Sequence, residues 1–292
     1  MTALPYAERQ FLTQDGLSLY YRDYDSGTGA GATLLCLAGL TRNSADFAEL
    51  AEAHAGERRI VCLDYRGRGR SDRAGDWRTY TPETYVNDIR HLIVATGLHG
   101  FVPVGTSLGG FLSMVLGAVM PSAIAGVVLN DVGPQIETAA TAEIADYAGA
   151  DRPVPDWPAA VAAVRERFPE FEAWDDATFE AAARANYREG SDGLLHYNWD
   201  VDLVKPIRRA TAPRQDLWAM FRSLHHVPVL AIRGGNSDLL TDAGLNAMLD
   251  DHPDITGVTV PGVGHAPRLH EPAAAGAVST FLESIDRQRR HE

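Results

Sequence analysis

Short apolar runs alternate along the chain with longer helical segments, and this alternation restricts the fold more than any other feature. The runs rich in Val, Ile and Leu, which we expect to be strands, are 32–40, 58–65, 100–105, 125–133, 227–235 and 255–262. Helices are expected between most of them, at 44–56, 81–97, 109–121 and 242–253, with a last helix at 272–288. Strands that are apolar on both faces and separated by helices form mainly parallel sheets with helices on both faces. The predicted fold class is therefore α/β.

Two segments depart from the alternation. Residues 10–24 alternate polar and apolar side chains on either side of Asp15-Gly16, a pattern typical of a β-hairpin. Residues 134–221 read as helical and irregular, with no convincing buried strand. We interpret them as a helical cap inserted into a core made of residues 1–133 and 222–292, over the sheet edge where ligands bind in open parallel sheets.

The predicted cap is rich in aromatic residues. It holds 11 of the 24 aromatic residues of the chain, among them Trp157, Trp174, Trp199 and Trp218. These side chains either line an apolar substrate pocket or pack the cap onto the core, and the sequence leaves both roles open. Trp199 is a candidate substrate contact.

Charge and hydropathy exclude several classes of partner. The chain has a formal net charge of −13, which repels nucleic acid phosphates and anionic lipid. No basic segment followed by an apolar one opens the sequence, and no apolar run approaches the about 20 residues needed to cross a bilayer. We expect a cytoplasmic protein that binds neither nucleic acid nor membrane. Cys36 and Cys62 each lie in a strand-like run, so both are expected to be buried thiols.

A serine stands where one apolar run ends and a helix begins. Residues 105–109, Gly-Thr-Ser-Leu-Gly, follow the strand at 100–105 and open the helix at 109–121. A nucleophile elbow has this setting, because glycines on either side of a serine let strand and helix approach closely. Ser107 is therefore the candidate nucleophile. The Leu108 N–H at the helix start and the Leu40 N–H after the strand at 32–40 are the candidate donors to an oxyanion.

A serine nucleophile needs a base and an acid that orients the base. His265 lies after the last predicted strand and is the candidate base. Asp238 follows the strand at 227–235 and gives the chain order serine, acid, histidine, so it is the preferred acid. Asp131, after the strand at 125–133, is the alternative acid.

Five segments in this order resemble the α/β-hydrolase fold, in its cap-bearing esterase, lactonase and C–C hydrolase type: "LLCLAGLTRNSADF", "VCLDYRGRGRSD", "VGTSLGG", "IRGGNSDLLT" and "VPGVGHAPRLHEP". The resemblance implies the roles given above for Ser107, Asp238, His265, Leu40 and Leu108. Relatives that are dehalogenases or epoxide hydrolases have an aspartate at the elbow, so the serine implies acyl chemistry.

The chain departs from this family at one position of the oxyanion loop. Ala38-Gly39 stands where the family often has His-Gly, so support from a histidine side chain is absent. The nearby arginines Arg66, Arg68 and Arg70 form either an anion site or, as we favour, a structural network of ion pairs.

The predicted function is hydrolysis of a carboxylic ester or lactone through an acyl-enzyme, with no metal and no organic cofactor. The alternatives are hydrolysis of a C–C bond in a ring-fission diketone and, less favoured, ligand binding without turnover. The partner is expected to be a small, partly apolar substrate. Arg42 and Asn43 are candidate contacts for a polar substrate group or else stabilise their loop. The sequence leaves the oligomeric state open, a homo-oligomer included.

Overall fold

The sheet is mainly parallel, as predicted. The structure, a computed structural model, describes residues 6–25, 27, 29–135, 138–168, 171, 174–209 and 217–290, without the side chains of 138–142. Its large sheet has the order β1-β2-β4-β3-β5-β6-β9-β10. The strands are β1 (Ala7–Leu12), β2 (Ser18–Tyr24), β3 (Leu34–Leu37), β4 (Ile60–Leu63), β5 (Val102–Thr106), β6 (Val127–Asn130), β9 (Val229–Gly234) and β10 (Ile255–Val260). Strands β1 and β2 pair antiparallel around Asp15-Gly16, β2 pairs antiparallel with β4, and the other pairs are parallel.

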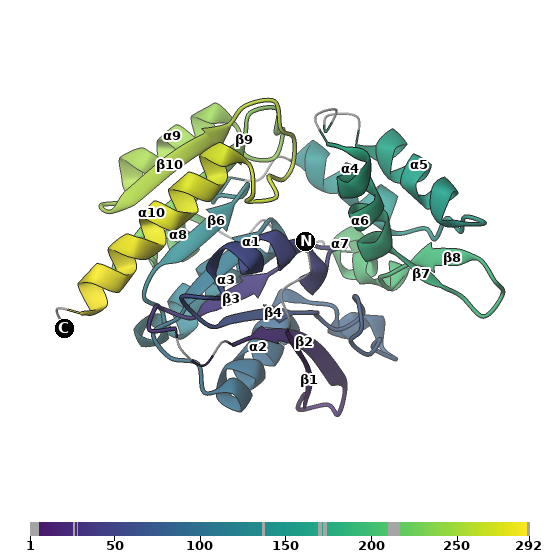
Figure 1. Cartoon of the computed structure of the whole chain (residues 1–292), viewed down its shortest axis with the longest axis horizontal. Coiled ribbons are helices and arrows are strands. Elements are labelled where there is room, and N and C mark those ends of the chain that lie inside the picture. Colours follow the sequence, from purple (N-terminus) through teal and green to yellow (C-terminus); the bar gives the residue numbers. More distant parts are fainter. Residues whose placement is uncertain are drawn as a thin grey trace.

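Helices cover both faces of this sheet (Figure 1). The core helices are α1 (Ala48–His54), α2 (Pro82–Thr96), α3 (Leu108–Val119), α8 (Leu217–Arg222), α9 (Asp242–Asp251) and α10 (Pro272–Arg289), with short 3₁₀ turns η1 (Ser44–Phe47), η2 (Trp77–Thr79) and η3 (Pro121–Ala123). Buried side chains of α1 and α10 share one apolar cluster, and those of α2, α3 and α9 share the other. The two apolar faces predicted for the strands are thus both covered.

Residues between β6 and β9 form a separate group of elements. These are α4 (Thr138–Ala148), α5 (Trp157–Arg167), α6 (Asp176–Asn186), β7 (Tyr187–Glu189), β8 (Leu195–Tyr197), η5 (Val201–Val204) and α7 (Lys205–Arg209), which lie together at one side of the molecule (Figure 1). We call this group the cap. The sequence missed its antiparallel hairpin β7–β8, because each strand is only three residues long.

The predicted cap, 134–221, extends beyond this group at its C-terminal end. Helix α8 packs against α3 of the core, and Phe221 on α8 is fully buried. The placement of α8 argues for a cap that ends before it. Residues 136–137, 169–170, 172–173 and 210–216 of the predicted cap lie outside the described residues.

Two further expectations concern the cysteines and the membrane. Cys36 and Cys62 are free and fully buried, and they are partners in the register of β3 and β4. This confirms the prediction of buried thiols. No helix in the described part of the chain combines the length and apolar character needed to span a bilayer.

Candidate active site

Ser107 occupies a strained turn between β5 and α3. Its backbone has φ 52° and ψ −113°, a left-handed conformation that is uncommon for a residue with a side chain. The Ser107 N–H donates to the Asn130 carbonyl at the end of β6 (3.0 Å), and the Ser107 carbonyl accepts from the Phe111 N–H (3.0 Å). Backbone strain that neighbouring hydrogen bonds maintain is a feature of functional sites.

The glycines around Ser107 make this turn possible. A Cβ atom at Gly105 would collide with the Gly109 carbonyl, and one at Gly109 would collide with the Leu37 carbonyl on β3. The close approach of strand and helix that the sequence predicted is therefore present, and it depends on residues without side chains.

His265 forms a hydrogen bond with Asp131. The distance from His265 Nδ1 to Asp131 Oδ2 is 2.7 Å, and the second carboxylate oxygen accepts from the Gly234 N–H at 3.0 Å. Asp131 has no exposed surface, whereas a quarter of the His265 side chain is exposed. A carboxylate oxygen accepts hydrogen bonds, so this contact suits a His265 tautomer with its proton on Nδ1, in which Nε2 is an acceptor.

The structure therefore corrects the preference for Asp238. Asp238 is exposed, and His265 pairs with the alternative, Asp131. The physical reason lies in the turn after β9: Gly235 and Asn236 donate their N–H groups to the carbonyls of Val260 and Val263. These bonds tie the turn to the end of β10 and to the loop after it, and Asp238 lies at the surface. Asp131 instead lies directly at the end of β6, across the end of β9.

The two predicted oxyanion donors are free of other bonds. Within the described residues, neither the Leu40 N–H nor the Leu108 N–H donates a hydrogen bond. Leu108 is the first residue of α3, where the helix leaves its N–H groups unpaired. Leu40 lines the same pocket as Ser107 and His265.

Arg68 holds the Leu40 peptide, a role that the sequence did not reveal. Its Nε donates to the Leu40 carbonyl at 2.8 Å, and its Nη1 donates to the Arg66 carbonyl and the Tyr85 hydroxyl, both at 2.8 Å. The Arg68 side chain is buried, and it supports the loop where the family often has a histidine. Its position in "DYRGRGRSD" was visible in the sequence, but its partner on another loop was not.

The other two arginines of that segment form ion pairs, which is the role that the sequence favoured over an anion site. Arg66 pairs with Asp88 (Nε to Oδ2, 2.7 Å) and Asp15 (Nη1 to Oδ2, 2.8 Å), and Arg70 pairs with Glu8. The hydrogen bonds from Arg66 lower the pKa of Asp15 to about 2. These pairs hold the segment to β1, its turn and α2, away from the pocket.

Asn130 is a second residue that the sequence did not single out. It is fully buried at the end of β6, and its Nδ2 donates to the Pro267 carbonyl (2.7 Å) and to Thr106 Oγ1 (3.0 Å). One amide thus joins the loop of His265 to the residue before Ser107. The sequence did contain a signal for this role, because Asn130 is a polar residue at the end of an apolar strand and directly precedes Asp131.

The pocket over Ser107 and His265 has a volume of about 140 Å³. The core contributes the loop from Gly39 to Arg42 and the loop from His265 to Leu269. The cap and the segment after α5 contribute aromatic side chains: Tyr147, Phe168, Phe171 and Trp174. The pocket therefore lies at the carboxyl ends of the parallel strands, between the core and the cap.

The candidate substrate contacts are placed differently from one another. Arg42 lines the pocket but is held by Asp46 (Nε to Oδ2 and Nη2 to Oδ1, both 2.6 Å) and by Asn186 Oδ1 on α6 (2.6 Å). Asn43 is buried outside the pocket lining; it accepts from the Ala45 N–H and donates to the Ala185 carbonyl. Its role is to join the loop to the cap.

Trp199 does not line the pocket, which corrects its assignment as a substrate contact. It is almost fully buried, stacks on Tyr197 with 4.0 Å between ring centroids, and donates its Nε1–H to the Ala148 carbonyl. The aromatic residues of the cap thus divide between its own packing and the pocket wall. The sequence could not separate the two groups, because both are apolar.

Similar proteins share this architecture. Residues 32–272 match the family described as alpha/beta hydrolase fold. The 3-hydroxybutyrate-oligomer hydrolase of Cupriavidus necator is 34% identical over 262 residues, which cover 85% of this chain and 87% of that protein. The 2-(acetamidomethylene)succinate hydrolase of Mesorhizobium japonicum is 30% identical over 258 residues, 88% of this chain and 90% of that protein.

Solved structures agree. An alpha/beta hydrolase from Novosphingobium aromaticivorans has a TM-score of 0.89 and 37% sequence identity, with 95% of this chain and 98% of that chain covered. The family model covers most of the chain, and the sheet, its helices and the elbow have the arrangement that the sequence segments predicted. The chain therefore belongs to the α/β-hydrolase family and is an enzyme of the hydrolase class.

Proposed function

We propose that this hydrolase cleaves a carboxylic ester or lactone through an acyl-enzyme, with Ser107 as nucleophile, His265 as base and Asp131 as the acid that orients the base. The observation that carries the proposal is the hydrogen bond from buried Asp131 to His265, which lines the same pocket as the strained Ser107. Asp131 replaces Asp238 in the triad on this geometry.

The proposed reaction has two steps. His265 Nε2 takes the hydroxyl proton of Ser107 as the serine oxygen attacks the substrate carbonyl, and Asp131 stabilises the imidazolium that forms. The free N–H groups of Leu40 and Leu108 donate to the oxyanion of the tetrahedral intermediate. Collapse expels the alcohol, which receives the proton from His265. Water, activated by His265, then attacks the acyl-enzyme and releases the acid.

The names of the relatives support an ester as substrate. One of them acts on 3-hydroxybutyrate oligomers, and the units of a hydroxy acid oligomer are joined by ester bonds. Its similarity extends over 85% of this chain and 87% of that protein.

Replacement of the nucleophile tests the proposal. Ser107→Ala should lower kcat for ester hydrolysis by roughly 10³- to 10⁶-fold, as deletion of a triad serine does. The matched control is Ser284→Ala, because Ser284 lies on α10, does not line the pocket, and donates its hydroxyl to the Phe281 carbonyl. Hydrolysis would be followed with short-chain and long-chain esters, lactones and the 3-hydroxybutyrate dimer. An undiminished rate in Ser107→Ala would refute the proposal.

The same panel addresses the C–C hydrolase alternative. A vinylogous diketone from ring fission would be added to the esters and lactones. Turnover of the diketone alone would replace ester hydrolysis with C–C hydrolysis on the same three side chains. Failure of Ser107 to react with a fluorophosphonate would instead favour a pocket that binds without turnover.

A further inference from the structure

The pocket carries positive charge although the chain as a whole is strongly negative. Among the described residues, three arginines line it, Arg42, Arg167 and Arg268, together with one carboxylate, Asp46. The formal net charge of the chain is −13. A positively charged pocket attracts anionic ligands, even in a protein whose net charge is negative. This contrast indicates an anionic ligand.

Arg42 does not contribute to the excess. Asp46, which also lines the pocket, accepts two hydrogen bonds from Arg42 and neutralises it. The other two arginines, Arg167 and Arg268, pair with carboxylates that are not part of the pocket lining, Glu143 and Glu49.

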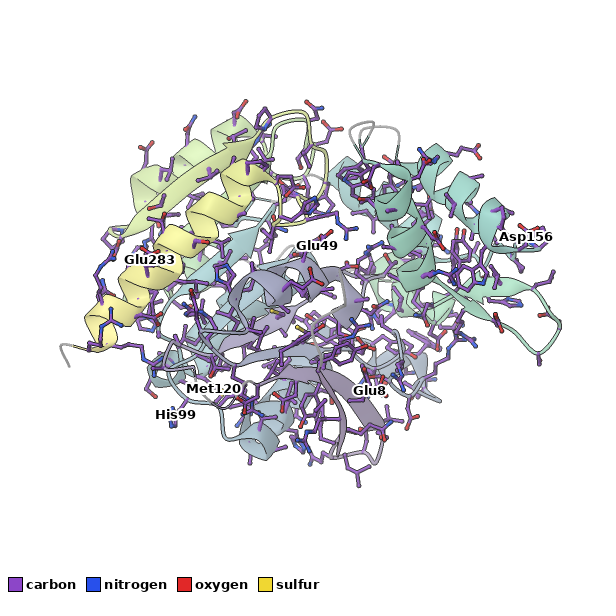
Figure 2. The ribbon with its side chains drawn as sticks, viewed as in Figure 1. Glu8, Glu49, His99, Met120, Asp156 and Glu283 are labelled. Carbon is purple, nitrogen blue, oxygen red and sulfur yellow. The ribbon has the colours of Figure 1, made fainter. Side chains whose placement is uncertain are left out.

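Arg268 has an unused donor. Its Nε and Nη2 both donate to one oxygen of Glu49, at 3.3 and 3.1 Å, and within the described part of the chain its Nη1 has no hydrogen-bond partner. Glu49 also pairs with His270 Nδ1 at 3.0 Å, so its charge is shared. Glu49 is not part of the pocket lining and lies on the side of α1 that faces the cap (Figure 2). The Arg268 side chain is only 13% exposed, which keeps its charge at the pocket wall.

Arg167 is weakly paired as well. It comes from the last turn of α5 in the cap, and its ion pair is with Glu143, at 3.2 Å. The Glu143 side chain is 71% exposed, and an ion pair with such a partner is screened by water. Arg167 also lies over the rings of Tyr147 and Phe168, at 4.9 and 5.3 Å from their centroids.

Aromatic rings connect the two cations. Phe171 contacts Phe168 with 6.1 Å between centroids and stacks on Trp174 at 4.3 Å, and Arg268 lies 5.0 Å from the Trp174 centroid. An apolar wall limits the water around a guanidinium, which strengthens its attraction for an anion. Planar guanidinium groups with free N–H donors match the geometry of a carboxylate.

We propose that the substrate is an ester bearing a free carboxylate, and that Arg268 and Arg167 bind this carboxylate while the ester carbonyl lies at Ser107. The inference rests on the proposed ester hydrolysis and narrows it to anionic esters. It assigns the aromatic row to the apolar part of the substrate, between the carboxylate and the reacting bond.

Two matched pairs of esters test the proposal. In the first, the 3-hydroxybutyrate dimer is compared with the same dimer carrying a primary amide in place of its carboxylate. In the second, monoethyl succinate is compared with ethyl succinamate, which moves the carboxylate to the acyl part. Because a hydrogen bond to a charged group is strong, kcat/KM for the carboxylate member of at least one pair should be roughly 10- to 100-fold higher.

Variants identify the groups responsible. Arg268→Gln and Arg167→Gln should each lower kcat/KM for the preferred carboxylate roughly tenfold or more, mainly through KM, and leave the amide within about twofold. The control is Arg184→Gln, which removes an exposed cap arginine that pairs with Glu180 and does not line the pocket. Arg184→Gln should change kcat/KM for neither the carboxylate nor the amide.

The outcomes separate this proposal from the proposed function. Equal hydrolysis of the carboxylate and amide members in both pairs would refute carboxylate recognition and leave ester hydrolysis standing. Equal losses on both members in the arginine variants would refute the assignment to Arg268 and Arg167. Absence of hydrolysis of every ester by the wild-type enzyme would refute both proposals together.

Discussion

Asp131 combines burial with a strained backbone at the end of β6. Its φ is 55°, and its carboxylate accepts from both Gly234 and His265. Burial of a carboxylate is costly unless it is hydrogen-bonded, so these two bonds are what make its position tolerable. The same two hydrogen bonds fix the orientation of the Asp131 carboxylate and, through it, the orientation of the His265 ring.

Substitution of the two aspartates separates their roles. Asp131→Asn should lower kcat for ester hydrolysis about 10⁴-fold, because the amide favours the wrong histidine tautomer. Asp238→Asn should change kcat by less than about twofold, since Asp238 is exposed and His265 bonds to Asp131. Steady-state kinetics on one ester measures both. A large loss in Asp238→Asn with an active Asp131→Asn enzyme would reverse the assignment.

At the scale of elements, the β5–α3 unit shows why glycines were informative in the sequence. Gly109 lies in the first turn of α3 and faces the Leu37 carbonyl of β3, where no side chain fits. Gly276 lies inside α10 and has nothing near the position of a Cβ atom. One glycine is required by packing, and the other only weakens its helix.

An alanine at each position should have opposite effects. Gly109→Ala should lower the free energy of unfolding by about 2 kcal/mol or more through overpacking. Gly276→Ala should raise it by about 0.5–1 kcal/mol, because alanine restricts the unfolded chain and favours the helix. Urea denaturation followed by circular dichroism measures both. A neutral Gly109→Ala would mean that β3 and α3 can separate without cost.

The alternation of strand and helix runs was enough to predict the sheet and its covering helices. It failed for the hairpin β7–β8, because three-residue strands leave no periodic pattern. The predicted cap, 134–221, also includes most of α8, which packs against α3 of the core. Helix α8 is short and follows the cap in sequence, yet its packing partner α3 precedes the cap. Contacts between distant segments are not encoded in a local pattern.

At the scale of the whole molecule, the buried histidine His252 links stability to pH. His252 follows α9, its Nε2–H donates to the Leu224 carbonyl at 3.0 Å, and its Nδ1 accepts from the Asp254 N–H at 3.1 Å. This pattern requires the neutral ring. Burial lowers the pKa of His252 below 6.5, with a further contribution from the charge of His225.

The direction of the pH effect follows. Below pH 6.5 the unfolded chain takes up a proton that the folded protein resists until the lower pKa is reached, so stability falls on acidification through this range. His252→Gln should reduce the loss of unfolding free energy between pH 7 and pH 5 by up to about 1.4 kcal/mol per pH unit. His99→Gln, at an exposed histidine (Figure 2), is the control. An unchanged slope in His252→Gln would exclude His252 as the cause.

The sequence by itself determined the α/β sheet, the elbow around Ser107 and the position of His265 after the last strand, because apolar periodicity and glycine spacing act over short stretches of chain. The tertiary structure decided that Asp131, 134 residues from His265, is its partner, that Arg68 holds the Leu40 loop, and which cap aromatics face the pocket. These choices depend on which strand ends and loops meet in space. Two aspartates that each follow a buried strand look alike in the sequence, and only the path of the backbone after β9 distinguishes them.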